Sequence, residues 1–467
     1  MAREPMKDII VLLPGITGSV LEKDGKVAWG FNAGSITKTA LTRGGSMRDA
    51  LLLEQDPPDV DDLGDGVKAS RLIPDLHLIP GLTKIDGYTK VAKQIQSTFD
   101  VKPGENFIEF PYDWRRTNVV SARKLRRESH DWLERWREKT NNKDAKLILV
   151  AHSMGGLVSR YFLEIFEGWK DTRSLITFGT PFRGALNAVD SLVNGVRKGP
   201  FGLLDLSELT RSFTAVYQLL PMYACYDAGD GNLVRVGETT GIPNIDPARA
   251  AAALAFHREI EAAVATKLDT SDYRDNRYAV HPVIGIQQRT AQTARRDGNG
   301  VRMLEERNGK DESGDGTVPR ISAIPIEYSK ADIGMFAATK HAALQNADAV
   351  LVQLEGIITG MTLDLGAVKA GPGLVSLSLD VEDLYFDTEP VVVRALPSKE
   401  GTALIAKIID SATNAIVAHQ QLAQTPDGWH SAQFGPFGAG EYRVSVTGEK
   451  TEPAMDAFAV GAEPAEE

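Results

Sequence analysis

Cysteine is almost absent from this 467-residue chain, where Cys225 is the only one. A single thiol excludes an internal disulfide. Long apolar runs are also lacking: no stretch approaches the roughly 20 residues of a membrane-spanning helix. Only five consecutive apolar residues precede Pro14, too few for the core of a signal peptide. We therefore expect a cytoplasmic protein.

The chain also lacks an excess of positive charge, with 52 Lys and Arg against 63 Asp and Glu and a net charge of −11. This balance argues against nucleic-acid binding and against simple attraction to anionic membranes, although it allows transient contact with a membrane surface. The basic run 123–127 lies in a helical pattern and is best explained as a solvated face. The length and the 42% of hydrophobic residues indicate a globular protein of more than one domain.

The most informative segment is 146–158, KLILVAHSMGGLV. An apolar, β-leaning run ends at Ser153, and an amphipathic helical pattern begins at once. This is the sequence form of a nucleophile elbow, in which small residues two before and two after the serine let strand and helix approach. The usual pattern is G-x-S-x-G, whereas this chain has Ala151 at the first position and Gly155 at the last. The alternative is an ordinary strand–turn–helix with a solvated serine, so the rest of the chain must decide.

In enzymes with a nucleophile elbow, the catalytic acid and histidine follow the serine in the chain and lie on loops. Asp315 stands between two glycines after a strand-like stretch, and we take it as the acid. Of the eight histidines only His341, His419 and His430 follow it, and the last two fall in what looks like a separate domain. His341 is therefore the expected base, although a histidine without context is more often a surface or core residue.

An oxyanion hole needs the amide of the residue after the serine, here Met154, and one from a loop after an early strand. The segment 9–13 is such a strand, and glycines 15 and 18 allow the next loop to turn an amide inward. The Ile16 amide is the first candidate and that of Thr17 the second. A plain strand–helix connection explains this loop nearly as well.

A calcium-binding loop is the competing interpretation of the acidic stretch that begins at Asp311. It fails because its third position is Ser313, and Ser322 occupies the position of the bidentate glutamate. We therefore expect no metal and no cofactor.

These motifs resemble those of the lecithin:cholesterol acyltransferase and lysosomal phospholipase A2 group of α/β-hydrolases, including its bacterial esterase-like members. The resemblance runs from about residue 8 to about 358 and is carried by these segments: Leu13-Pro14-Gly15, Phe110-Pro111-Tyr112-Asp113-Trp114-Arg115-Arg116, Ala151-His152-Ser153-Met154-Gly155, Thr177-Phe178-Gly179-Thr180-Pro181 and Gly314-Asp315-Gly316-Thr317-Val318. The family's nucleophile, acid and base then fall on Ser153, Asp315 and His341.

The resemblance implies acyl transfer from a glycerolipid or another ester, through an acyl-serine, to water or to an alcohol. Secreted animal members of the family carry disulfides, and this chain departs from them in its single cysteine. We expect Thr17, Tyr112 and Trp114 to contact the substrate. A structural turn is the alternative role for the segment 112–114.

Between Thr180 and a hairpin-like region near 283–304, long amphipathic segments replace the strand–helix alternation. Asp246-Pro247 is a good helix start, and Phe256, Ile260, Val264 and Leu268 follow four apart. We interpret residues 185–282 as a cap that receives an acyl chain and excludes water. The alternative is that most of these apolar faces simply pack on the core.

From about residue 365 the pattern changes to short alternating runs separated by turn residues. This indicates a small immunoglobulin-like β-sandwich over 370–460, followed by a disordered tail at 461–467. We expect the sandwich to dock to another protein; a stabilising appendage is the alternative.

The sequence thus predicts an α/β-hydrolase domain over 1–362, with a mostly parallel sheet and a helical cap, followed by an all-β sandwich. The expected function is that of a serine esterase or lipase acting on a phospholipid or other glycerolipid. The alternatives are an acyltransferase with an alcohol acceptor and a catalytically silent scaffold acting through the sandwich.

Overall fold

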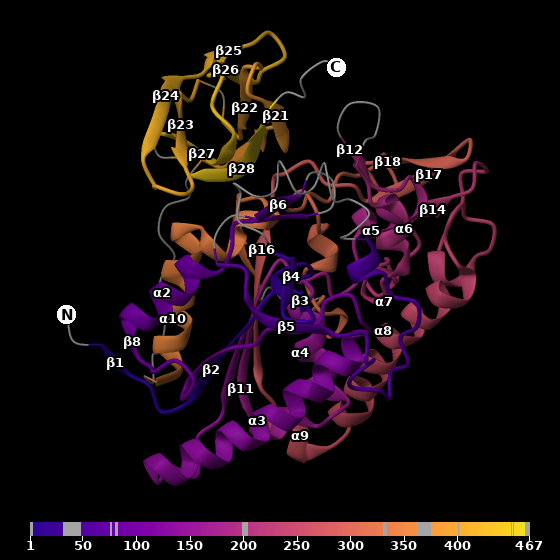
Figure 1. Cartoon of the computed structure of the whole chain (residues 1–467), viewed down its shortest axis with the longest axis vertical. Helices are drawn as coiled ribbons and strands as arrows, with labels where there is room; N and C mark the ends of the chain where they lie inside the picture. The colour runs from indigo at the N-terminus through magenta and orange to yellow at the C-terminus, as the bar shows by residue number, and fades with distance from the viewer. Residues whose placement is uncertain are drawn as a thin grey trace.

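A six-stranded parallel sheet forms the centre of the computed structural model, which describes residues 3–30, 48–74, 77–79, 83–198, 204–329, 334–362, 375–399, 401–449, 451 and 453–462 (Figure 1). Each neighbouring pair of its strands is parallel. In spatial order the strands are β19 (Met335–Ala337), β16 (Ala279–Gly285), β11 (Thr172–Phe178), β10 (Leu147–His152), β2 (Ile9–Leu13) and β9 (Phe107–Glu109).

The central strands are apolar at nearly every position because both faces of the sheet are covered. In β2, Ile9 and Val11 enter one core, and Ile10 and Leu12 enter a second core on the opposite face. The first core contains residues of α3 (Asn118–Thr140) and α4 (Gly155–Glu164), and the second contains residues of α2 (Thr89–Thr98) and α10 (Asp348–Thr362). The result is the three-layer arrangement that an alternation of strands and helices predicts.

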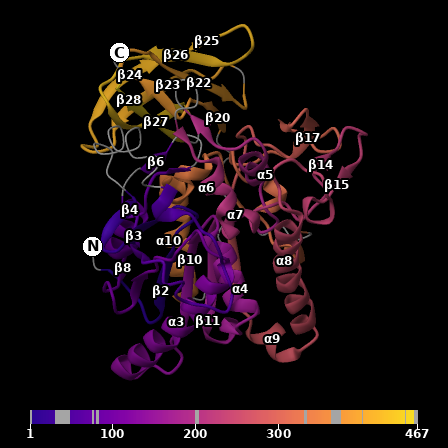
Figure 2. The same cartoon turned by 45° about the vertical axis from the view of Figure 1, so that its right-hand side comes forward.

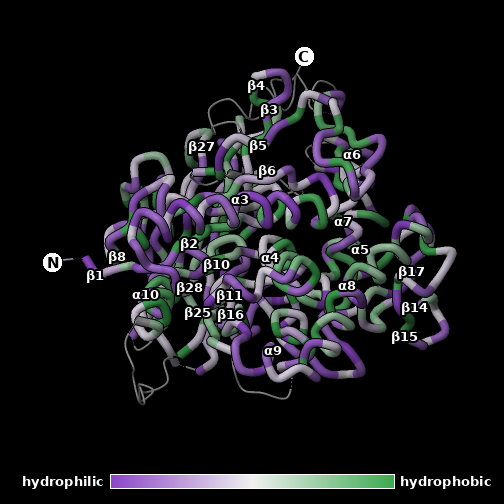
Figure 3. The backbone as a smooth tube through the Cα atoms, turned by 90° about the horizontal axis from the view of Figure 1, so that it is seen from below, coloured by the Kyte–Doolittle hydropathy of each residue, from purple (hydrophilic) through white to green (hydrophobic). Residues whose placement is uncertain are grey.

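The helix α3 begins where the Thr117 hydroxyl accepts a hydrogen bond from the Val119 amide, and it ends at Asn141, whose φ of +50° is left-handed. Figure 3 shows its backbone coloured mostly as hydrophilic, which suits a helix with only one buried face. The basic run 123–127 lies within α3, where Leu125 is buried and Arg126 is exposed. The predicted solvated face thus holds for Arg126 and Arg127, whereas Arg123 and Lys124 are half-buried.

The segment between β11 and β16 forms a mainly helical insertion. Its elements are α5 (Leu186–Val193), β12 (Arg197–Lys198), β13 (Leu204–Asp205), α6 (Ser207–Ser212), α7 (Thr214–Tyr217), β14 (Tyr226–Asp227), β15 (Leu233–Val234), η3 (Val236–Glu238), α8 (Pro247–Leu268) and α9 (Ser271–Asn276). The hairpin of β17 (Thr293–Asp297) and β18 (Gly300–Leu304) completes a sheet with β14 and β15. The insertion therefore forms a sheet together with residues beyond 282.

The long helix α8 starts as predicted, with the Asp246 carboxylate accepting from two amides of the first turn and Pro247 as first residue. Its position differs from the one expected for a helix of the cap. It packs against α4, where the Phe256 ring stacks on Tyr161. The apolar face of α8 is thus covered by the core, as the alternative interpretation held.

Short elements surround the central sheet. They are β1 (Glu4–Pro5), β3 (Ser19–Lys23), β4 (Lys26–Trp29), β5 (Val67–Leu72), β6 (His77–Ile79), β7 (Thr83–Ile85), β8 (Phe99–Asp100), η1 (Gly168–Asp171), η4 (Arg320–Ser322), η5 (Ile326–Tyr328) and η6 (His341–Asn346). Among them β3 and η6 matter for function, because each adjoins a segment that carries a predicted site residue.

The C-terminal strands form two facing sheets around a separate apolar core. One sheet contains β20 (Leu377–Asp380), β22 (Val391–Pro397), β26 (His430–Phe434) and β25 (Ala423–Gln424). The other contains β21 (Leu384–Phe386), β28 (Ala454–Gly461), β27 (Gly440–Gly448), β23 (Leu404–Asp410) and β24 (Ile416–Gln421). Figure 2 shows this β-sandwich stacked on one end of the α/β part. The predicted fold class is therefore confirmed for both parts.

The last strand extends slightly further than expected. Gly461 pairs with Phe386 as the final residue of β28, so the predicted tail cannot start there. Residues 463–467 and most of the predicted connection between the two parts lie outside the described residues.

Candidate active site

The serine of the predicted elbow occupies the sharp turn between β10 and α4. Ser153 has a φ of +51°, a left-handed conformation that is costly for a residue with a side chain. Its amide donates to the Phe178 carbonyl at 2.8 Å, which fixes the turn against the neighbouring strand. A Cβ on Gly155 would lie 2.5 Å from the Pro14 carbonyl oxygen. This close approach explains the glycine, while the methyl group of Ala151 is buried within β10.

The structure brings the three predicted side chains together in a line. The Nε2 of His341 lies 2.9 Å from the Ser153 hydroxyl oxygen, and its Nδ1 lies 2.7 Å from Oδ2 of Asp315. All three are largely buried, with the Asp315 side chain 1% and that of His341 12% exposed. This is the order and spacing that lets a histidine take a proton from a serine while a carboxylate holds the ring.

Asp315 is held in place by its own turn. Its Oδ1 accepts hydrogen bonds from the amides of Thr317 and Val318 at 2.9 and 2.6 Å, which leaves Oδ2 for the histidine. The His341 amide also donates to the Asp315 carbonyl at 2.8 Å. Acid and base are therefore joined through both backbone and side chain.

The other predicted family motif, 177–181, places a glycine beside this pair. Gly179 has a φ of +56°, and a Cβ there would lie 2.7 Å from Oδ2 of Asp315 and 2.8 Å from Nδ1 of His341. Both the backbone conformation and the contact therefore require glycine at this position.

A second histidine, to which the sequence motifs assign no role, connects these segments. The Nε2 of His152 lies 3.1 Å from the His341 carbonyl oxygen, and its Nδ1 lies 2.9 Å from the Tyr88 hydroxyl. Since a carbonyl only accepts, Nε2 carries the proton and Nδ1 accepts from Tyr88. The Tyr88 oxygen in turn accepts from the Gly15 amide at 2.8 Å. Burial, and then the neighbouring His341, lower the pKa of His152 to about 3, so its ring is neutral.

The loop expected to supply an oxyanion donor is fixed by aromatic side chains. Tyr112 donates to the Pro14 carbonyl at 2.8 Å, Trp114 to the Ser19 carbonyl at 3.0 Å, and Trp29 to the Thr17 carbonyl at 2.9 Å. Tyr112 lies outside the cavity that contains Ser153, so the structural alternative holds for it. Its ring is buried and its hydroxyl is used by the loop. Trp29 has no motif around it that could have revealed this role.

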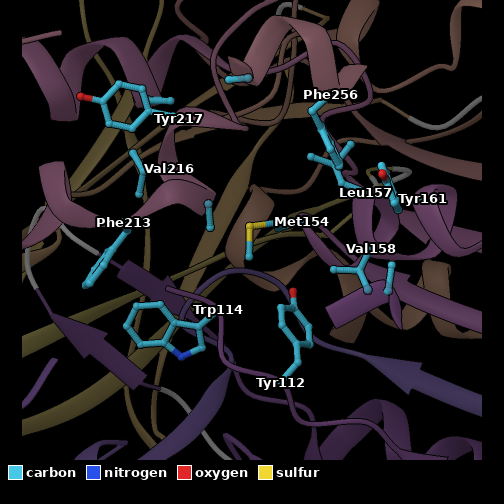
Figure 4. Packing of buried hydrophobic residues seen from close by; sticks show 14 of the residues in the cluster. Tyr112, Trp114, Met154, Leu157, Val158, Tyr161, Phe213, Val216, Tyr217 and Phe256 are labelled. Atoms are coloured by element: carbon cyan, nitrogen blue, oxygen red, sulfur yellow. The ribbon is translucent and has the colours of Figure 1, made fainter. Parts of the chain in front are cut away.

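Trp114 has both a position at the cavity and a packing contact. It borders the cavity, and its ring also packs edge-on against Phe213 with centroids 5.5 Å apart. Figure 4 shows Met154 between these aromatic side chains and Leu157. Among the described residues, neither the Ile16 nor the Met154 amide has a hydrogen-bond acceptor, as two oxyanion donors would require.

A cavity of about 450 Å³ opens onto Ser153 and His341. Ile16 and Thr17 border it on one side, and the helices α5 to α7 border it on another through residues such as Ala188 and Val216. This part of the insertion does cover the site, whereas α8 does not reach it. A larger hollow of about 940 Å³ lies between the segment 53–59 and α8 and contains none of the three predicted catalytic residues.

A parallel sheet with helices on both faces, a strained serine after a central strand, and an aspartate and a histidine on later loops define an α/β-hydrolase. The family model of lecithin:cholesterol acyltransferase matches residues 76–242, which include Ser153. This segment of the chain is similar to that family, which confirms the predicted resemblance over these residues.

Two curated relatives match short stretches of the chain. The human lysosomal phospholipase A and acyltransferase is 31% identical over 126 residues, which cover 25% of this chain and 29% of that protein. The uncharacterized protein YJR098C of Saccharomyces cerevisiae is 29% identical over 176 residues, 37% of this chain and 23% of that protein. The chain therefore spans less than a third of either relative.

Solved structures resemble this one at low sequence identity. A chain of the Tle4–Tli4 complex is 14% identical, with a TM-score of 0.48 over 78% of this chain and 100% of that one. The mature form of the Bacillus licheniformis lipase BlEst2 is 14% identical, with a TM-score of 0.35 over 76% of this chain and 94% of that one.

Proposed function

We propose that the protein is a serine hydrolase that cleaves ester-linked acyl groups, with Ser153 as nucleophile, His341 as base and Asp315 as the residue that orients the base. The observation that carries the proposal is the continuous contact from Ser153 through His341 to Asp315, at 2.9 and 2.7 Å, on a strained turn that faces a cavity. A merely solvated serine would need neither the strain nor the buried carboxylate.

The proposed reaction begins when the Ser153 oxygen attacks the ester carbonyl carbon and His341 Nε2 takes the hydroxyl proton. The carbonyl oxygen becomes an oxyanion, which the amides of Ile16 and Met154 stabilise. Collapse of this intermediate breaks the bond to the alcohol, which leaves with the proton from His341, and an acyl-serine is formed. Water then repeats the steps and releases the carboxylic acid.

The proposed substrate class is a phospholipid or other glycerolipid. The name of the human relative, a phospholipase A and acyltransferase, supports this class, as do the apolar side chains at the cavity. Among the described residues no helix is long and apolar enough to cross a bilayer. The proposed mode of access is transient contact with a lipid surface or uptake of dispersed substrate, and a cytoplasmic location stays a prediction.

Hydrolysis and transfer differ only in the nucleophile that reaches the acyl-serine. The acyltransferase part of the human relative's name makes transfer to an alcohol the second candidate. Products formed from a phospholipid with and without an added long-chain alcohol separate the two: free fatty acid alone indicates a hydrolase, and a new alkyl ester indicates a transferase.

A fluorophosphonate probe tests the proposal directly, because it phosphonylates only an activated serine. We expect labelling of Ser153 in the full chain, identified by peptide mass, and loss of labelling and ester turnover in Ser153→Ala with circular dichroism unchanged. Turnover by Ser153→Ala at the wild-type rate would disprove it. A folded wild-type protein without labelling or turnover on a panel of esters would instead favour the silent scaffold.

A further inference from the structure

The β-sandwich contacts the segment that carries His341. Lys340, the residue before His341, forms a 3.0 Å ion pair with Asp456 of β28. The Asp456 side chain is 1% exposed and that of Lys340 24% exposed. Burying a carboxylate costs free energy unless a positive charge pairs with it. The Lys340–Asp456 pair therefore connects the His341 segment to the sandwich.

A second contact reaches the segment of the acid. Gln288, which is buried, forms an isolated parallel bridge with Asp315, its amide donating to the Gly314 carbonyl at 3.0 Å. Its side chain points to the sandwich: the Nε2 donates to the Leu377 carbonyl and the Oε1 accepts from the Leu379 amide, both at 3.0 Å. One residue thus joins β20 of the sandwich to the backbone that positions Asp315.

A third contact supports the far end of η6. Arg443 of β27 is paired with the buried Asp86. The Asp86 amide donates to the Ala342 carbonyl at 3.0 Å, and the Asn346 side chain donates to the Asp86 carbonyl at 2.7 Å. The helix η6, which starts at His341, is therefore held from the sandwich at both of its ends.

We propose that the β-sandwich is part of the catalytic apparatus: through Lys340–Asp456 and Gln288 it fixes the segments of His341 and Asp315 relative to Ser153. Lys340, Asp456 and Gln288 are positioning residues, because they act through the base and the acid. This inference rests on the proposed serine chemistry. It does not exclude the expected docking role, because the exposed Ile405, Ile416 and Val417 lie on β23 and β24, toward the opposite edge of the sheet that contains Asp456.

The geometry also makes the sandwich a wall of the cavity. Asp383 and Asp456 border the same cavity as Ser153, together with Arg289 and Lys340 of the α/β part. Loss of the ion pair would therefore disturb the position of the base without removing any group that touches the scissile ester. A small ester such as p-nitrophenyl acetate reports this effect separately from lipid binding.

The test measures kcat and KM for p-nitrophenyl acetate, the rate of fluorophosphonate labelling and the melting temperature in full-length variants. We expect Lys340→Gln and Asp456→Asn each to lower kcat and the labelling rate about tenfold with KM little changed, because small displacements of a catalytic group are costly. The double variant should be no slower than the slower single variant, because each single substitution already removes the same ion pair. Lys340→Arg, which keeps the charge, should restore most of the rate.

Arg394→Gln is the matched control, because it removes ion pairs with Asp427 and Asp380 within the same sandwich and leaves the Lys340–Asp456 pair in place. It should leave kcat unchanged. If Asp456→Asn fails to fold, Lys340→Gln and Gln288→Ala still test the inference, because each removes one contact between the sandwich and the α/β part. Wild-type kcat in both of these, even with a lowered melting temperature, would overturn the inference and leave the sandwich a stabilising appendage. An inactive and unlabelled wild-type protein would instead overturn the proposed function itself.

Discussion

His152 donates a hydrogen bond from its Nε2 to the backbone carbonyl of His341 at 3.1 Å, so the residue before the proposed nucleophile holds the backbone of the proposed base. Through Tyr88 the same ring reaches the Gly15 amide of the oxyanion loop. Three segments distant in the chain are thus connected by one neutral imidazole and one phenol.

Tyr88→Phe should reduce kcat about tenfold or more while leaving the fold intact. The change removes the acceptor of the Gly15 amide and the donor to His152, and an unsatisfied buried amide costs about 1–3 kcal/mol. The loop is then expected to shift and misplace the Ile16 donor. Steady-state turnover of a short ester measures the effect. Tyr385→Phe, which removes a hydroxyl in the sandwich, is the control, and equal rates in the two variants would contradict the role of Tyr88.

Ser153→Gly should be more stable than Ser153→Ala, although both should be inactive. At a φ of +51° any Cβ is strained, and glycine relieves about 1–2 kcal/mol of that cost. Urea denaturation of the two variants measures the difference. Equal stabilities would show that the turn is not strained in solution.

Gly179→Ala should lower kcat by about a hundredfold. Its new methyl group would stand 2.7 and 2.8 Å from the facing atoms of Asp315 and His341, so the pair must separate. Fluorophosphonate labelling should slow in parallel. Gly241→Ala is a suitable comparison, because Gly241 also has a positive φ but no atom of the described residues lies within 4 Å of its Cβ position. If both variants lose activity equally, the contact with the acid–base pair is not the cause.

Stability should fall more steeply toward acid in the wild type than in His257→Gln. Burial lowers the pKa of His257 to about 4, so between that value and about 6.5 only the unfolded chain takes up a proton on this residue. Unfolding is therefore favoured as the pH falls. From pH 7 to 5 the wild type should lose about 2 kcal/mol more free energy of unfolding than the variant.

Glutamine suits this comparison because its side-chain amide can replace the His257 bond to the Gln218 carbonyl. His152, whose pKa is lowered to about 3, contributes in the same direction in both proteins and cancels. Urea titrations at the two pH values supply the data. Parallel pH profiles would contradict a buried neutral His257.

Cys225 should resist alkylation in the native protein. It is fully buried, and desolvation raises the pKa of its thiol to about 12, so almost no thiolate exists near neutral pH. Iodoacetamide should modify it only when urea unfolds the chain. Rapid modification of the folded protein would show that the core around it opens.

The local motifs were readable because the elbow places its requirements on adjacent residues. A strand, a serine and small neighbours must follow one another, and the acid and base must come later in the chain. The roles of Tyr88, Trp29 and His152 were not readable, because their hydrogen bonds join residues up to 189 positions apart in the chain. Tyr112 was assigned to the substrate because an aromatic motif does not reveal which way its hydroxyl points.

The sequence by itself determined the order of strands and helices, the strained serine turn and the β-sandwich, since these depend on periodicity and on steric limits between neighbouring residues. Only the tertiary structure decided that α8 packs on the core instead of over Ser153, and that the sandwich meets the His341 segment through Lys340 and Asp456. Such contacts depend on which surfaces the completed layers bring together, and no local pattern in the chain specifies that pairing.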